Sequence, residues 1–180
     1  SAQTKGRRSD RPRTGKPELP DVYVTAGDLP AVVDDAEDSL LDHGTQVFRR
    51  GDQLVRPVRL SYSERGLQRP DPGTGLREVD QDWLEEKLTA AANWWKYDKR
   101  SEDWVPIDAP KTVAAKLLSR AGEWRAPPIV AVVEAPTLRP DGSILDRAGY
   151  DDGTGLLFEP GGTDFGELPD QPSRADAAAA

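Results

Sequence analysis

The sequence has no cysteine, no methionine and a single histidine. Without cysteine the chain cannot form disulfides, a thiolate zinc site or a cysteine nucleophile. One histidine excludes metal sites built on histidine pairs. No apolar run approaches the roughly 18 residues that a membrane helix needs, so we predict no membrane partner. The missing initiator methionine predicts a fragment or a processed chain.

Apolar residues are also scarce, at 36 % of 180 residues, against roughly 45–50 % in an average globular chain. They concentrate in the middle of the sequence, so we predict one domain with two disordered tails. The predicted organisation is a basic arm at 1–20, a single α+β domain at 21–159, and an acidic linker at 160–180 that leads toward a missing downstream module.

Hydrophobic periodicity predicts three helices, at about 30–43, 81–95 and 110–121. Short strands are predicted between them, at 22–25, 46–49, 53–58, 129–135, 143–145 and 156–158. The second and third of these strands flank Arg50-Gly-Asp52 and should form a hairpin. The predicted fold class is therefore α+β, with three helices packed on short antiparallel strands and hairpins.

The charges are segregated along the chain, although their sum is −8. Residues 21–45 hold seven acidic side chains and no lysine or arginine, whereas residues 46–77 hold seven arginines against three acids. Such polarity can present a local cationic face to nucleic acid. Alternatively, the acidic helix and the arginine-rich segment neutralise each other in the fold.

Two groups of residues are candidates for binding single-stranded DNA. Arginines of the predicted hairpin would face phosphates, and an aromatic–basic segment would supply a ledge on which bases stack. The candidates are Arg49, Arg50, Arg56 and Arg59 on the hairpin, and Trp94, Lys96, Lys99 and Arg100 on the ledge. In the alternative interpretation Trp94, Tyr97 and Trp104 close a core that is short of aliphatic side chains.

Catalytic motifs are not found in the sequence. Lys111-Thr112 lacks the glycine-rich loop of a phosphate site, and His43 stands at a predicted helix end, where a cation favours the dipole. Four aspartates, Asp141, Asp146, Asp151 and Asp152, could hold Mg²⁺ in a small metal-dependent enzyme. Turn formation explains the same Asp-Gly patterns better. We therefore predict no enzyme activity, no cofactor and no metal.

Four segments, at 47–56, 95–104, 110–124 and 135–156, together resemble the region that precedes the ATPase module in primase–helicase proteins of bacteriophages and integrated mobile elements. The resemblance spans about 22–176 and is most specific at 136–156. Arg50-Gly-Asp52 departs from it, because a more neutral glycine-rich turn is expected there. None of the matching segments contains a catalytic motif. The resemblance therefore implies the context of a replication protein and no active site.

That context implies a non-catalytic accessory domain that guides DNA during replication in the cytoplasm of a bacterial host. Its partners would be single-stranded DNA and the neighbouring primase and helicase modules. The alternative is a protein–protein docking or oligomerisation domain that binds no nucleic acid. In that case the acidic helix at 30–43 would be the contact face, and charge segregation would serve pairing.

Overall fold

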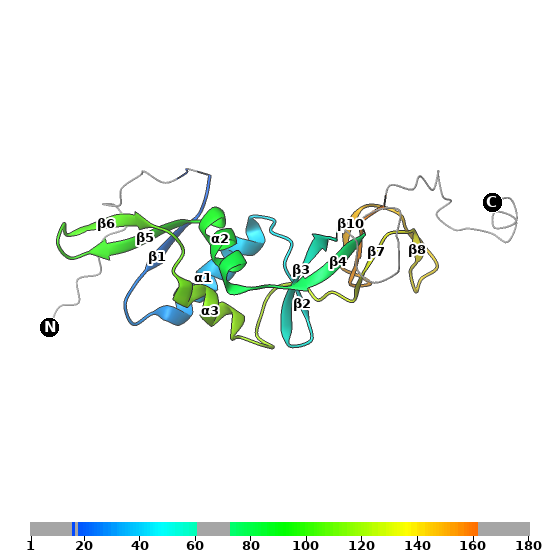
Figure 1. Cartoon of the computed structure of the whole chain (residues 1–180), viewed down its shortest axis with the longest axis horizontal. Coiled ribbons are helices and arrows are strands. Elements are labelled where there is room, and N and C mark those ends of the chain that lie inside the picture. Colours follow the sequence, from blue (N-terminus) through cyan, green and yellow to red (C-terminus); the bar gives the residue numbers. More distant parts are fainter. Residues whose placement is uncertain (1–15, 17, 61–72, 162–180) are drawn as a thin grey trace, which may run out of the picture. The chain divides into compact units, whose positions relative to one another are not determined.

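A computed structural model of the chain describes residues 16, 18–60 and 73–161. The tails predicted to be disordered therefore lie largely outside the described residues. The fold class is α+β, as predicted, with three helices and short strands (Figure 1). None of the described helices combines the length and the apolar character that crossing a membrane requires.

The described residues divide into two compact units, whereas we predicted a single domain over 21–159. Unit 1 takes its residues from the ranges 1–45 and 80–125, and unit 2 takes them from 46–79 and 126–180. Both units are thus built from two separate stretches of sequence. Local patterns carry no signal for such an interruption, because it depends on contacts between residues far apart in the chain.

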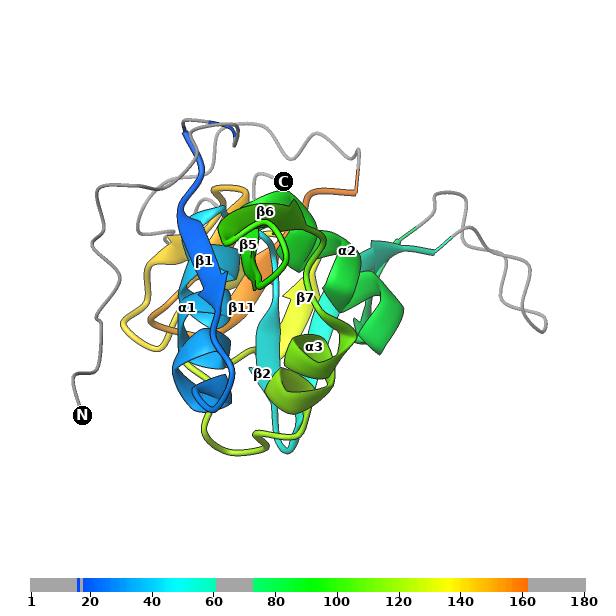
Figure 2. The ribbon, with the colours of Figure 1, turned by 90° about the vertical axis from the view of Figure 1, so that its left-hand side faces the viewer.

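Unit 1 contains the three helices and one three-stranded sheet. In chain order its elements are β1 (Asp21–Val24), α1 (Leu29–Asp42), α2 (Gln81–Ala91), β5 (Asn93–Asp98), β6 (Asp103–Ile107) and α3 (Lys111–Leu118). The strand order is β1-β5-β6, with β1 parallel to β5 and β5 antiparallel to β6. The sheet is therefore mixed rather than purely antiparallel. Figure 2 shows this sheet with α1 beside β1.

One face of this sheet packs on the helices. Successive side chains of a strand point to opposite faces, and Val22 and Trp94 stand opposite each other in the β1–β5 register. Both are almost fully buried, at 1 % and 2 % exposure. The apolar stripes of α1, α2 and α3 contribute Val33, Leu88 and Leu117 among others to the same buried interior.

Helix α2 ends four residues earlier than predicted. Its apolar spacing continues to Trp95, which suggested a helix over 81–95, but the backbone is already extended at Ala92. Trp94 and Trp95 instead lie in β5 and are both buried. Aromatic residues favour strands, and pairing with strands on both sides satisfies the backbone of β5. Tertiary pairing therefore overrides the helical period.

The indole nitrogens of two tryptophans donate hydrogen bonds to backbone carbonyls near helix C-termini in unit 1. The indole nitrogen of Trp94 donates to the carbonyl of Leu88, 2.8 Å away in α2, and that of Trp124 donates to the carbonyl of Leu117, 2.7 Å away in α3. The last four carbonyls of a helix lack partners within it. Each indole therefore fills apolar space and satisfies one of these carbonyls.

Unit 2 is built from short strands. These are β2 (Phe48–Arg50), β3 (Gln53–Arg59), β4 (Thr74–Glu78), β7 (Ala131–Val133), β8 (Thr137–Leu138), β9 (Ile144–Leu145), β10 (Gly149–Asp151) and β11 (Leu156–Phe158). One sheet has the order β2-β3-β4 and a second the order β10-β11-β7, while β8 and β9 form a small hairpin. The predicted hairpin around Gly51 is confirmed as β2 and β3.

The two three-stranded sheets of unit 2 share one apolar core. Phe48, Val55, Ile129 and Leu157 are its buried members, and Leu76, Val132 and Tyr150 pack against them. Backbone bonds also join the segment before β7 to β2: Arg49 donates to the carbonyl of Pro127, and its own carbonyl accepts from Ile129, both at 2.9 Å. The backbone of β2 is therefore held on both of its edges.

We expect Trp94→Phe to lower the free energy of unfolding by roughly 1–3 kcal/mol, because a buried carbonyl of α2 loses its donor. Trp104→Phe is the matched control, since the Trp104 side chain is less buried and its indole nitrogen bonds to no described residue. Urea denaturation of both variants measures the difference. Equal losses in the two variants would contradict the capping role of Trp94.

Candidate nucleic-acid interface

The register of the β2-β3-β4 sheet sorts its arginines onto two faces. Phe48 and Val55 stand opposite each other and point into the core of unit 2. Side chains one residue further along therefore point to the opposite face. That second face carries Arg49, Arg56 and Arg77, with Arg56 and Arg77 directly opposite in the β3–β4 register, and also Leu54, which is 4 % exposed. Arg50 and Arg59 lie on the core-facing side, beyond the core itself.

Four of these guanidinium groups are exposed to solvent. They belong to Arg49, Arg50, Arg59 and Arg77, whereas Arg56 is half-buried. Within the described residues, none of the four exposed side chains makes a hydrogen bond or an ion pair. We call Arg49, Arg50, Arg59 and Arg77 together the arginine face, with Arg49 and Arg77 on one side of the sheet and Arg50 and Arg59 on the other. Its members are held by sheet backbone and are available to an external anion.

Arg77 was absent from the candidate residues taken from the sequence. Its segment showed no clear strand pattern, because Gly73 and Gly75 flank Thr74 and a charged pair ends the run. The structure places it in β4, directly across from Arg56. Arg77 is one of the seven arginines counted over 46–77. Its position beside the hairpin, however, follows from the pairing of β4 with β3, which local sequence patterns do not reveal.

Trp94 is not available for stacking, which corrects the prediction that it forms part of a ledge. Its ring is 2 % exposed, and its indole nitrogen bonds to Leu88. Strand alternation places it on the side of β5 that packs against the helices. The alternative interpretation, in which this ring closes the core, therefore describes Trp94 correctly.

The other three residues of the predicted ledge are exposed. Lys96 lies within β5, and Lys99 and Arg100 lie in the turn that joins β5 to β6. All three belong to unit 1, while the hairpin arginines belong to unit 2. The predicted site thus consists of two sets of residues on two compact units.

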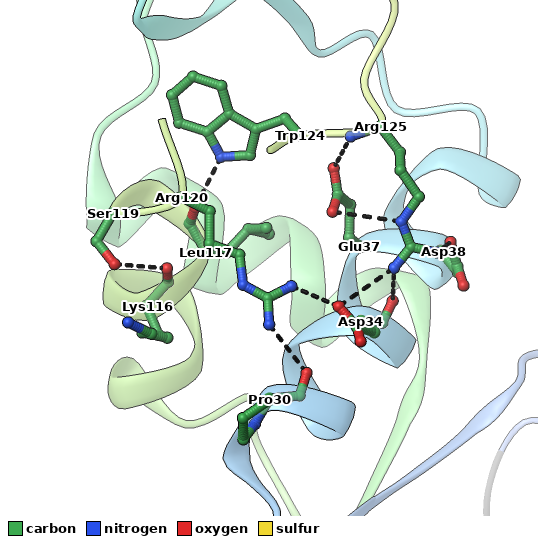
Figure 3. Close-up of polar contacts among 10 residues, drawn as sticks. All are labelled: Pro30, Asp34, Glu37, Asp38, Lys116, Leu117, Ser119, Arg120, Trp124 and Arg125. Carbon is green, nitrogen blue, oxygen red and sulfur yellow. Dashed lines mark hydrogen bonds and ion pairs between the residues drawn. The ribbon is translucent and has the colours of Figure 1, made fainter. Parts of the chain in front are cut away.

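Three of the five acidic side chains of α1, those of Asp34, Glu37 and Asp38, have partners within unit 1 (Figure 3). Arg120 donates to Asp34 at 2.5 Å and to the carbonyl of Pro30 at 3.0 Å. Arg125 pairs with Asp38, and its backbone N–H donates to Glu37 at 2.6 Å. Glu37 is buried at 3 % exposure, although its sequence pattern placed it off the apolar face.

These pairings answer how the acidic helix is neutralised. The sequence offered the arginine-rich segment at 46–77 as the counter-charge of this helix, but within the described residues the ion-pair partners of its paired carboxylates are Arg120 and Arg125, which follow α3. The hydrogen bond from Arg120 holds the pKa of Asp34 below its ordinary value of 3.8. The alternative function, docking to a protein partner through α1, still has exposed carboxylates available for contact, such as that of Asp35. However, charge reversal at Asp34 or Asp38 would also break these internal pairs.

Two of the four late aspartates, Asp141 and Asp151, form hydrogen bonds within turns, as their sequence context indicated. Asp141 accepts hydrogen bonds from the backbone and hydroxyl of Ser143, at 3.0 and 2.7 Å. Asp151 accepts from Arg139 at 3.0 Å and from the hydroxyl of Thr154 at 2.6 Å. In the part of the chain that the structure describes, no three histidine or carboxylate side chains are grouped to hold a metal ion.

In a comparison with known proteins, no family model, no curated protein and no solved structure matches the chain.

Arg120→Gln should move the pKa of Asp34 up toward 3.8, because the charged donor is lost. A carboxyl group whose pKa is lowered in the folded state stabilises it above the unfolded value, and this contribution is lost as the pH falls through the folded value. The variant should therefore lose less stability on acidification than the parent chain. Carboxyl NMR titration and urea denaturation at several pH values measure both effects.

Lys116→Gln removes the same charge from an exposed position of α3 and serves as the control. It should leave the titration of Asp34 as it is in the parent chain. An Asp34 pKa that stays equally low in Arg120→Gln would show that Arg120 is not the cause of the shift.

Proposed function

We propose that this chain is a non-catalytic accessory domain that guides DNA, from a primase–helicase replication protein of a bacteriophage or mobile element. The observation that carries the DNA-guiding part is the arginine face of unit 2. The replication context rests on the sequence resemblance of the segments between 47 and 156. The proposed partners are DNA and the neighbouring primase and helicase modules, in the cytoplasm of a bacterial host.

An anion is the ligand that suits the arginine face. Arg49 and Arg77 are exposed and make no hydrogen bond or ion pair within the described residues, so a phosphate can reach their guanidinium groups. Guanidinium groups match phosphate geometry through two parallel N–H donors, which a lysine ammonium group cannot provide.

The fold favours repeated phosphates over a single small anion. Arg49, Arg59 and Arg77 come from three adjacent strands and lie on both faces of the sheet, so they do not converge on one point. Contacts of this kind position a nucleic-acid backbone without reading its sequence. The expected role is therefore to hold and guide DNA, not to select a site.

The remaining charges of the chain limit the affinity. The net charge of −8 repels a polyanion at long range. The internal pairs of α1 neutralise part of the acidic charge, because Asp34 and Asp38 are bound to Arg120 and Arg125. Binding should consequently be weak and strongly dependent on salt, since each phosphate contact releases a counterion.

The test compares Arg49→Gln/Arg77→Gln with Arg147→Gln/Lys116→Gln in the full chain. Both double variants lose two positive charges, but Arg147 and Lys116 are exposed and lie outside the arginine face. Fluorescence anisotropy with labelled DNA over a range of salt gives the slope of log K against log salt. The first variant should lower the magnitude of this slope by about 0.7–0.9 per lost phosphate contact.

Equal slopes in the two double variants would contradict the arginine face. A parent chain that binds no DNA at low salt would contradict DNA guiding altogether, and would favour docking to a protein partner instead.

A further inference from the structure

The face of the β1-β5-β6 sheet that does not pack on the helices carries a cluster of aromatic rings. Trp104 of β6 lies at its centre. Its ring centroid is 4.9 Å from that of Tyr23 in β1 and 5.7 Å from that of Tyr97 in β5, both in edge-to-face geometry. We call Tyr23, Tyr97 and Trp104 the aromatic face. Side chains of all three strands of the sheet therefore meet on this surface.

The register explains why these rings gather there. Tyr97 stands opposite Trp104, and Tyr23 stands opposite Trp95 two residues before Tyr97 in β5. All four side chains therefore point to the same side of the sheet, away from Val22 and Trp94. Trp95 is buried and donates to Asp21 at 2.9 Å, whereas Tyr97 is 44 % exposed.

Among the described residues Tyr97 is one of four exposed large hydrophobic side chains, and it is the aromatic one of the four. Trp104 and Tyr23 are half-buried, so their rings are also partly accessible. Two tyrosines and a tryptophan held by strand backbone lose little conformational freedom when a flat ligand stacks on them. Stacking on such rings is how proteins hold unpaired nucleobases without reading their sequence.

Cations stand at one end of the aromatic face. Lys99 and Arg100 occupy the turn after β5, are exposed, and make no side-chain ion pair within the described residues. Two acids of this turn are engaged locally: Asp98 accepts from the backbone of Arg100 and the hydroxyl of Ser101, both at 3.1 Å, and Asp103 accepts from the backbone of Trp104 at 2.7 Å. The third acid, Glu102, is exposed. Phosphates beside stacked bases would meet these two cations.

We propose that the aromatic face binds unpaired nucleobases of a single-stranded nucleic acid, with Lys99 and Arg100 at the flanking phosphates. This inference rests on the proposed DNA-guiding function and assigns the single-strand contact to a surface of unit 1 that the sequence did not single out. Tyr97 is the principal stacking ring, in the place that the sequence assigned to Trp94. Lys96 points to the other face of β5 and is not part of the site.

The two proposed contacts differ in how salt affects them. The acids around the aromatic face offset its cations, so stacking supplies most of its affinity and responds weakly to salt. The arginine face of unit 2 acts through phosphates and responds strongly to salt. Duplex DNA offers phosphates but no unpaired base, and therefore engages the arginine face alone.

The experiment titrates the full chain with an oligothymidylate of about 15 nucleotides and with a duplex of equal length. Tyr97→Ile keeps an apolar, strand-favouring side chain but removes the ring, and Tyr97→Phe is the matched control that keeps it. Tyr97→Ile should weaken binding of the single strand roughly 5- to 100-fold at an unchanged salt slope. Its affinity for the duplex should stay as in the parent chain.

Tryptophan fluorescence gives a second readout. Stacking near Trp104 should quench part of the emission, and Trp104→Phe should remove most of that quenching although four other tryptophans remain. Oligouridylate in place of oligothymidylate shows whether RNA or DNA binds more tightly, and weaker binding of either strand by Tyr97→Ile than by Tyr97→Phe supports the aromatic face.

Equal single-strand affinities for Tyr97→Ile and Tyr97→Phe would overturn the inference. A reduced salt slope in Arg49→Gln/Arg77→Gln, together with no effect of Tyr97→Ile, would sustain DNA guiding by the arginine face and refute stacking. An unchanged salt slope in that arginine variant, together with weaker single-strand binding by Tyr97→Ile, would sustain stacking on the aromatic face and refute DNA guiding by the arginine face.

Discussion

The ion pairs between α1 and the segment after α3 are the interaction on which the proposed binding of phosphate by the remaining arginines depends. Arg120 and Arg125 hold Asp34, Glu37 and Asp38 inside unit 1. The cationic partners of these carboxylates lie within unit 1, and the exposed arginines of the β2-β3-β4 sheet make no ion pair within the described residues. A strongly acidic chain thereby keeps a set of exposed guanidinium groups, and the case for phosphate binding depends on this separation.

Tryptophan has two distinct uses in unit 1, and the sequence alone does not separate them. Trp94 and Trp124 fill the interior and satisfy helix carbonyls, so they replace aliphatic side chains that the chain lacks. Trp104 lies on the outer face of the sheet between two tyrosines. Residues of one type thus supply both core volume and surface chemistry, depending on which side of a strand they occupy.

The parts of the fold that rest on local sequence signals were predictable. α1 and α3 follow clear apolar stripes, and the hairpin of β2 and β3 follows alternation around Gly51. The end of α2, the strands β4 to β6 and the division into two units depend on pairing between distant residues. For the candidate site this meant that the exposed hairpin arginines were found, Arg77 was missed, and Trp94 was chosen where Tyr97 carries the exposed ring.

The interrupted course of unit 1 has a consequence for how the chain folds on the ribosome. Its first segment ends at Thr45, and the segment that completes it begins at Asp80. While residues 46–79 are synthesised, the nascent α1 therefore lacks the residues that cover its apolar stripe. Its carboxylates also lack their ion-pair partners Arg120 and Arg125. Closing this loop costs little entropy beyond that of a shorter one, but it postpones cooperative folding of unit 1 until the polypeptide has passed Arg125.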